Sequence, residues 1–131
     1  MSEITNQPSG VPAGTAKPYD LEERTAQFAE NCRDFVKKLP KTNSNFEYGK
    51  QLIRSSGSQA ANYIEANESL GRRDFAMRIK ICRKETKESC LWLRLSDTNN
   101  IPELEKERKV LMDEALQLRK IFTSILEKSK F

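Results

Sequence analysis

The large apolar residues of the chain recur at alternating spacings of four and three, which is the period of an amphipathic α-helix. Four segments show this pattern, and no sustained alternation of period two or Asn-Gly turn competes with it. In the first segment, which Asp20 can cap and Pro40 ends, the stripe is Leu21, Thr25, Phe28, Cys32, Phe35 and Leu39. In the second, from about residue 44 to 67, it is Gly49, Ile53, Ser56, Ala60, Tyr63 and Asn67, with Phe46, Leu52 and Ile64 near it.

Two more helices follow a break at Gly71. The third spans residues 74–95, with Asp74 as its cap, and its stripe is Phe75, Ile79, Cys82, Thr86, Ser89 and Leu93. The fourth begins near Pro102 and carries Leu104, Leu111, Leu118, Ile121, Phe122 and Ile125. Four helices with short links predict an all-α fold, an antiparallel up-down-up-down four-helix bundle, over residues 20–131. Residues 1–19 contain prolines and glycines but few large apolar side chains, which predicts a disordered arm.

The middle of the second helix is built from small residues, which allow a neighbouring helix to approach closely. These residues are Ser55, Ser56, Gly57, Ser58, Ala60 and Ala61. The pattern GxxxxGK[ST] and a preceding strand are absent from the sequence, so close packing is favoured over a phosphate-binding loop.

Composition restricts the possible chemistry. The 131 residues include three cysteines, no CxxC pair and no histidine, which argues against a disulfide framework, a zinc site or a di-iron bundle. We therefore expect no metal and no cofactor, and we interpret Cys32 and Cys82 as buried small residues, with Cys90 at the edge of its stripe. No apolar run approaches the roughly 18 residues of a membrane span, and no signal peptide is evident. A cytoplasmic protein without membrane contact is the expectation.

The net charge of +4 is concentrated in the third helix. Residues 72–95 hold eight bases and three acids, a local excess of +5, and the bases gather on one flank of the apolar stripe. We call this set the basic flank: Arg73, Lys80, Arg83, Lys84, Lys87 and Arg94. A flank of one sign favours an anionic partner, and RNA or DNA bound through its phosphates is the natural polyanion. The alternative is an ordinary solvated face.

The other flank of the same helix combines acids with apolar side chains. We call this set the acidic flank: Met77, Ile81, Glu85, Glu88, Trp92 and Leu95, with Asp74 before them. One helix in a monomeric bundle buries about one face, so these apolar residues predict self-association, with the acids meeting bases of a neighbouring subunit. The alternative is that Trp92 lies at a broad helix contact within one chain.

The second and third helices, QLIRSSGSQAANYIEANESLGRRDFAMRIKICRKETKESCLWLRL, resemble the small bacterial four helix bundle proteins. That family includes proteins encoded within intervening sequences of large-subunit ribosomal RNA genes. The resemblance implies a ring-like homopentamer, and no enzymatic activity is established for the family. A related branch, the accessory variability protein of diversity-generating retroelements, binds nucleic acid and a reverse transcriptase. The matching positions are Arg54, Asn62, Glu65, Asp74, Phe75, Lys84, Glu85, Glu88, Trp92 and Leu93.

Two of the matching positions, Asn62 and Glu65, lie one turn apart near the end of the second helix, and together with Arg54 they predict a structural motif. A buried amide and carboxylate there can fix the connection to the third helix or reach a basic group. Three functions remain open: an oligomeric nucleic-acid-binding scaffold, a structural or protein-binding oligomer that ignores nucleic acid, and an enzyme using paired glutamates. No nucleophile or set of metal ligands accompanies those glutamates, which disfavours the enzyme.

Overall fold

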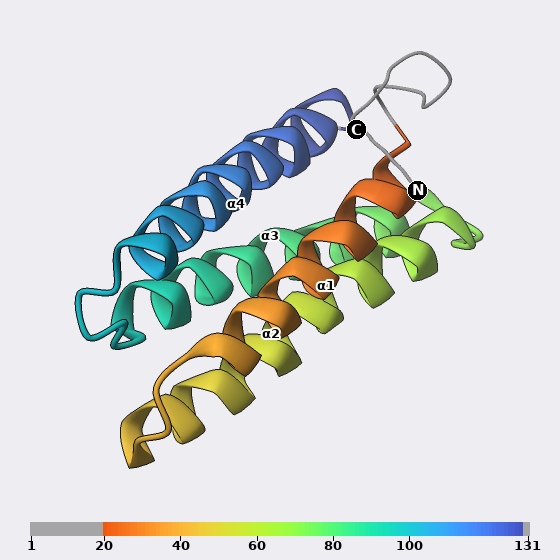
Figure 1. Cartoon of the computed structure of the whole chain (residues 1–131). Helices are drawn as coiled ribbons and strands as arrows, with labels where there is room; N and C mark the ends of the chain where they lie inside the picture. The colour runs from red at the N-terminus through yellow and green to blue at the C-terminus, as the bar shows by residue number, and fades with distance from the viewer. Residues whose placement is uncertain (1–19, 130–131) are drawn as a thin grey trace.

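Four helices follow one another through residues 20–129, the part of the chain that the computed structural model describes. They are α1 (Leu21–Lys38), α2 (Asn43–Asn67), α3 (Arg72–Leu95) and α4 (Pro102–Lys128). Consecutive helices run in opposite directions (Figure 1), each packs against the next, and α1 closes the bundle against α4. The predicted all-α four-helix bundle is therefore confirmed. The disordered arm predicted for residues 1–19 lies outside the described residues.

Two of the four described helices, α1 and α2, begin with a side chain that caps the backbone. The Asp20 side chain accepts a hydrogen bond from the Glu23 backbone N–H, and Thr42 caps α2 in the same way. Pro102 occupies the first turn of α4, as predicted. The prediction that Asp74 caps the third helix is wrong, because α3 begins at Arg72 after an extended Gly71. Asp74 lies inside the first turn, where its charge still complements the positive end of the helix dipole.

The core follows three of the four predicted stripes. All six predicted residues of α1 are buried, and so are five of the six in α3 and four of the six in α4. The exceptions, Phe75, Ile121 and Ile125, are half-buried against the same core. Ala115, a small residue that the sequence pattern missed, is also fully buried. Large apolar residues at helical spacing thus located the core of these helices correctly.

The predicted stripe of α2 is rotated away from the observed one. Ile53 is 46% exposed, and Asn67 is exposed, whereas Asn45, Gln59 and Ser55 are buried. Other buried residues of this helix are Gly49, Leu52, Ser56 and Ala66. The pattern failed here because the buried face of α2 is mostly polar, and polar side chains carry no hydrophobic signal.

Two of those buried polar side chains, Asn45 and Gln59, form hydrogen bonds to backbone groups of other helices and turns. The Gln59 amide donates to the Thr25 carbonyl of α1 at 2.8 Å. The Asn45 amide donates to the carbonyls of Pro40 and Asp97 at 2.9 and 2.8 Å, and its oxygen accepts from the Asp97 N–H at 2.8 Å. Burying an amide costs little only when its hydrogen-bonding groups find partners. Asn45 therefore links the α1–α2 turn to the α3–α4 turn through hydrogen bonds.

The small middle of α2 does bring a neighbouring helix close, but only on one side. Ser55 Oγ lies 2.7 Å from Ser89 Oγ of α3, with both residues fully buried. Gly49 is also needed, because a Cβ there would lie 2.8 Å from Cγ1 of Val36 on α1. Gly57 is different: a Cβ at that position meets nothing within 4 Å. No helix of the described chain packs closely on Gly57.

The cysteines take the predicted places. Cys32 and Cys82 are fully buried, and Cys90 is half-buried. Burial raises the pKa of both Cys32 and Cys82 to about 12. Among residues 20–129, no helix is both long enough and apolar enough to cross a membrane.

Candidate nucleic-acid interface

The two flanks of α3 face two different helices. Arg83 on the basic flank donates a hydrogen bond at 3.4 Å to the Thr123 hydroxyl of α4. On the acidic flank, Glu85 and Glu88 lie beside Arg54 of α2. Because α3 packs between α2 and α4, its apolar stripe points into the bundle while each flank borders one neighbour. The charge asymmetry of the sequence therefore becomes an asymmetry between two sides of the molecule.

The basic flank is presented to solvent. Five of its six residues are exposed, and Arg83 is half-buried. None of the six forms a salt bridge with an acid of the described part of the chain, although other bases do. The field of such an exposed charge is not cancelled by an opposite charge of the protein, and neighbouring charges of the same sign add to it. The exposed members are Arg73, Lys80, Lys84, Lys87 and Arg94.

Two arginines of α4 border this flank, and charge counting within separate helices did not identify them. Arg119 is close enough to Cys90 to lower the pKa of that thiol, against a larger rise caused by burial. Arg108 donates to the Ser96 carbonyl and pairs with Glu105 at 2.5 Å. That arginine is the main reason why the pKa of Glu105 is lowered. Arg108 is thus neutralised, whereas Arg119 extends the positive surface.

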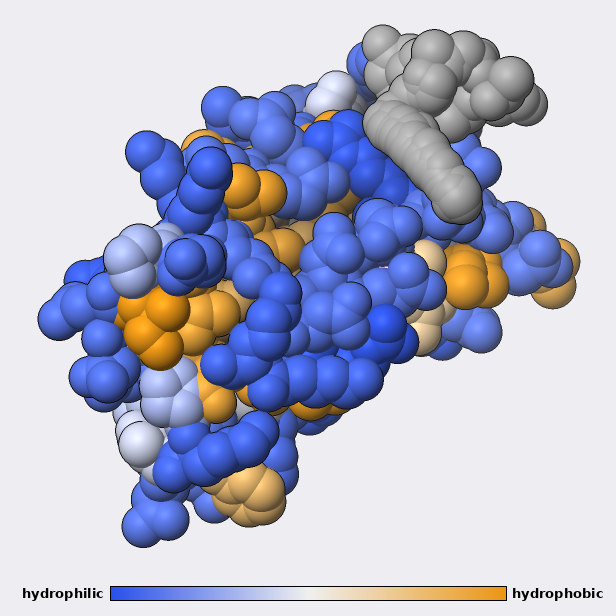
Figure 2. Space-filling model, in the orientation of Figure 1, coloured by the Kyte–Doolittle hydropathy of each residue, from blue (hydrophilic) through white to orange (hydrophobic). Residues whose placement is uncertain are grey.

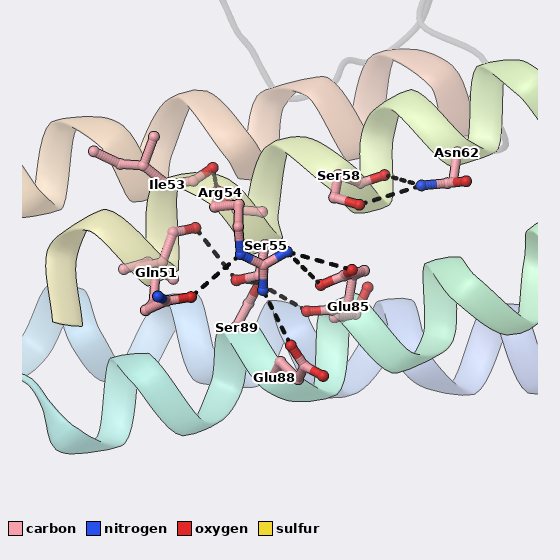
Figure 3. Close-up of polar contacts among 12 residues, drawn as sticks. Gln51, Ile53, Arg54, Ser55, Ser58, Asn62, Glu85, Glu88 and Ser89 are labelled. Atoms are coloured by element: carbon pink, nitrogen blue, oxygen red, sulfur yellow. Dashed lines mark hydrogen bonds and ion pairs between the residues drawn. The ribbon is translucent and has the colours of Figure 1, made fainter. Parts of the chain in front are cut away.

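The acidic flank is neutralised within the chain. Figure 3 shows Arg54 reaching from α2 to both acids of α3, with nitrogen–oxygen distances of 3.4 Å to Glu85 and 3.2 Å to Glu88. Gln51 Oε1 accepts from Nε of the same arginine at 3.2 Å. Glu85 is only 7% exposed, so its carboxylate depends on that arginine for compensation. The base predicted to come from a neighbouring subunit is supplied by α2.

Trp92 also packs inside the chain. Its ring stacks on Tyr48 of α2, with 5.9 Å between centroids and 24° between planes. Its indole nitrogen is buried without a hydrogen-bond partner in the described structure. Met77 and Leu95 are 58% and 40% exposed, and Ile81 is half-buried. Of the six predicted interface residues, Met77 and Leu95 remain the most available to a second molecule.

The three residues of the predicted motif in α2 do not form one cluster. The Asn62 amide donates to the Ser58 carbonyl at 3.0 Å, and its oxygen accepts from Arg78 of α3 at 3.0 Å. Arg54 lies more than two turns before Asn62 on α2, where it pairs with the acids of α3. The prediction of a buried carboxylate at Glu65 is wrong, because Glu65 is exposed. Asn62 and Arg54 therefore hold α2 to α3 at two separate levels.

The chemistry available along α3 is electrostatic. Within residues 20–129, no group of three or more acidic, cysteine or histidine side chains is placed to hold a metal ion. The paired acids Glu85 and Glu88 are engaged by Arg54 (Figure 3). A row of exposed cations can bind phosphates or acidic side chains without any bond being made or broken.

Comparisons with known proteins agree with this architecture. The family model described as 23S rRNA-intervening sequence protein matches residues 18–124. A crystal structure from Bacteroides thetaiotaomicron, of a protein with unknown function from the S23 ribosomal protein family, is 26% identical. The similarity covers 81% of this chain and 97% of that chain, with a TM-score of 0.71. No curated protein matches the chain. With the family model spanning all four helices nearly to the end of α4, the chain belongs to the 23S rRNA-intervening sequence protein family.

Proposed function

We propose that this protein is a non-enzymatic, oligomeric scaffold that binds nucleic acid through the basic flank of α3. The observation that carries the proposal is the row of five exposed cations without a salt bridge to a described acid. The row extends from residue 73 to 94, which is about 31 Å of helix at 1.5 Å per residue. Phosphates along a duplex lie within reach of side chains over that length.

Binding of this kind contacts the phosphates and does not distinguish between bases. Lysines and arginines that contact phosphates release the condensed counterions, so affinity falls steeply as salt rises. The described aromatic side chains do not alternate with the cations of the flank, so stacking on single-stranded bases has no platform there. We therefore expect an RNA or DNA duplex to bind with little sequence preference.

Fluorescence anisotropy of a labelled RNA duplex, titrated at several salt concentrations, tests the proposal. Lys80 and Lys84 are exposed one turn apart on α3. Replacing both by glutamate is expected to weaken binding at least about tenfold at low salt and to reduce the slope of log affinity against log salt by about two.

The matched control carries the same change of charge at the end of α1, the helix diagonal to α3, and in the turn that follows it. Lys37 and Lys41 are also exposed and four residues apart. Lys37→Glu with Lys41→Glu should retain most of the affinity, apart from the effect of lower net charge. Equal affinity for the wild type, the α3 variant and the α1 variant would show that the basic flank is not the site.

Self-association is the second part of the proposal, and the family resemblance implies a ring-like homopentamer. It is supported by the exposed apolar residues Met77 and Leu95 on the acidic flank. Met77→Glu with Leu95→Glu should lower the mass measured by sedimentation, while the thermal transition stays near that of wild type. A wild-type protein that sediments as a monomer would contradict this part of the proposal. Trp92 is a poor probe of assembly, because it also packs on Tyr48 within the chain.

An adaptor that binds only proteins is the alternative, and the same exposed apolar side chains favour it. The resemblance to the accessory variability protein suggests a reverse transcriptase as one such partner. Co-purification with a protein partner, combined with no retention of duplex at low salt, would select the adaptor over the nucleic-acid-binding scaffold.

A further inference from the structure

The part of α4 that faces the basic flank carries bases but no acid. Between Glu114 and Glu127, α4 contains Arg119 and Lys120 and no acidic residue. Glu114 itself points toward α1, where it pairs with Arg24 at 2.8 Å. The helices α3 and α4 pack side by side and run in opposite directions (Figure 1). The positive charge of α3 is therefore continued, and not balanced, by the facing part of α4.

Two half-buried arginines at this junction of α3 and α4 have no acidic partner. Residues 20–129 contain five half-buried arginines, and three of them bond to a glutamate or to an amide oxygen. Arg83 has a hydrogen bond of 3.4 Å to the Thr123 hydroxyl, whereas Arg119 has no hydrogen bond or ion pair with a described residue. A cation that is partly removed from water loses hydration, which a bound anion can replace. The three arginines that have partners are Arg24, Arg78 and Arg108.

The two arginines and Thr123 lie on adjoining turns of the two helices. Thr123 follows Arg119 by four residues, about one turn of α4, so their side chains leave the helix on the same side. That side faces α3, because Thr123 contacts Arg83 and the charge of Arg119 acts on Cys90. Cys90 lies about two turns after Arg83, so Arg119 faces the segment of α3 between them. We call Arg83, Arg119 and Thr123 the junction site.

The junction site offers hydrogen-bond donors and lacks acceptors. Each guanidinium presents several N–H groups in a planar fork, and Arg83 uses one of its nitrogens on Thr123. The Thr123 hydroxyl accepts that bond, and its own proton has no acceptor among the described residues. A phosphate group supplies negative charge and oxygens that point in several directions, so it can accept from donors on both helices. A planar carboxylate has only two oxygens and fits such a set less well.

We propose that a phosphate group of the duplex backbone binds at the junction site, between Arg83 and Arg119, with the Thr123 hydroxyl as a third donor. The inference deepens the proposed function and rests on its nucleic-acid binding, but not on its self-association. It moves the duplex from the outer face of α3 toward α4, so that one strand follows the line along which the two helices meet. The exposed lysines of the basic flank then add charge beside that strand, while the half-buried arginines fix its position.

Duplex binding by full-length variants tests the junction site, measured by fluorescence anisotropy at low salt. Arg119→Gln should weaken binding about five- to tenfold, and Thr123→Val about two- to threefold, because each removes a donor to the same phosphate. Lys120→Gln is the matched control, since it removes the same charge from the next residue of α4, which is exposed and points about 100° further round the helix. It should weaken binding less than about twofold. Thermal unfolding of Arg119→Gln should match that of wild type, because Arg119 bonds to no described residue.

Inorganic phosphate tests the same site without nucleic acid. Compared with sodium chloride at equal ionic strength, phosphate should raise the midpoint of thermal unfolding by about 2–4 °C in the wild type and in Lys120→Gln. In Arg119→Gln the rise should be less than about half as large. An equal rise in all three proteins, or an equal loss of duplex affinity from Arg119→Gln and Lys120→Gln, overturns the proposal.

Failure of the junction site and failure of the proposed function give different results. Suppose that Lys80→Glu with Lys84→Glu weakens duplex binding and Arg119→Gln leaves it unchanged. The phosphates then lie on the outer face of α3, and the junction site alone is wrong. Stabilisation by inorganic phosphate that depends on Arg119, without any binding of duplex, would instead identify free phosphate as the ligand and overturn the duplex as its source.

Discussion

The two flanks of α3 carry opposite charges and also have different surroundings. The acids of one flank lie against α2, where Arg54 neutralises Glu85 and Glu88, and the tryptophan there stacks on Tyr48. The cations of the other flank border α4 and have no described acid paired with them. Figure 2 shows one face of the molecule, on which hydrophilic residues predominate and apolar residues form separate patches. The difference teaches that a charged row is available to a partner only where the neighbouring helix leaves it unpaired.

The largest expected effect comes from removing the indole of the acidic flank. Trp92→Ala should lower the free energy of unfolding by about 2–3 kcal/mol, because the half-buried ring packs on Tyr48 and on the core. Urea unfolding monitored by circular dichroism measures the loss. A change below about 0.5 kcal/mol would mean that Trp92 contributes little within the chain, and the distinction between the flanks would fail.

The next effect concerns the ion pairs of the acidic flank. Arg54→Met should cost about 1–2 kcal/mol, because it leaves the buried Glu85 carboxylate without compensation, while the half-buried Glu88 is more easily hydrated. Adding Glu85→Gln should recover part of the loss, since a neutral amide is less costly to bury. A double-mutant cycle from urea unfolding gives the coupling, and strictly additive losses would contradict the pairing.

Cys82 lies in the apolar stripe between the two flanks, and its burial predicts that the free energy of unfolding falls at alkaline pH. Burial raises the pKa of its thiol from 9.0 to about 12, so the folded chain keeps a proton that the unfolded chain releases above about pH 9. Stability should therefore be unaffected by this group below pH 9 and fall by up to ~1.4 kcal/mol per pH unit between pH 9 and 12. Urea unfolding at pH 8 and pH 10 should show a smaller decline for Cys82→Ala than for wild type; equal declines would contradict the burial.

The smallest effect is expected on the basic flank. Lys84→Ala and Lys87→Ala should each change the free energy of unfolding by less than about 0.5 kcal/mol, because these exposed side chains form no described salt bridge. Thermal unfolding is sufficient to measure this. A loss above about 1 kcal/mol from either change would show that the flank supports the bundle and is not simply presented to a partner.

Prediction from sequence succeeded where burial is apolar. Phe28, Phe35 and Leu118 lie at helical spacing and are buried because removal of their large side chains from water drives the packing. It failed for Asn45 and Gln59, whose burial depends on carbonyl groups far away in the sequence. A hydrophobic pattern cannot reveal a hydrogen-bond partner that only folding brings near.

The basic flank was likewise visible in the sequence, because helical periodicity alone places its cations on one side of α3. The sequence did not show that Arg119 borders this flank, or that Glu105 neutralises Arg108. Both depend on how α4 lies beside α3. The acidic flank was recognised as a packing surface, but its contacts with Arg54 and Tyr48 come from the same chain.

By itself, the sequence determined four amphipathic helices, their order, most of their buried faces and the concentration of positive charge on α3, because these follow from spacing along one chain. Only the tertiary structure decided which helix borders each flank, which acids are neutralised, which buried polar groups are satisfied, and that Gly57 faces open space. These depend on distances between residues that are remote in sequence, and such distances are set by packing and hydrogen bonding of the whole bundle.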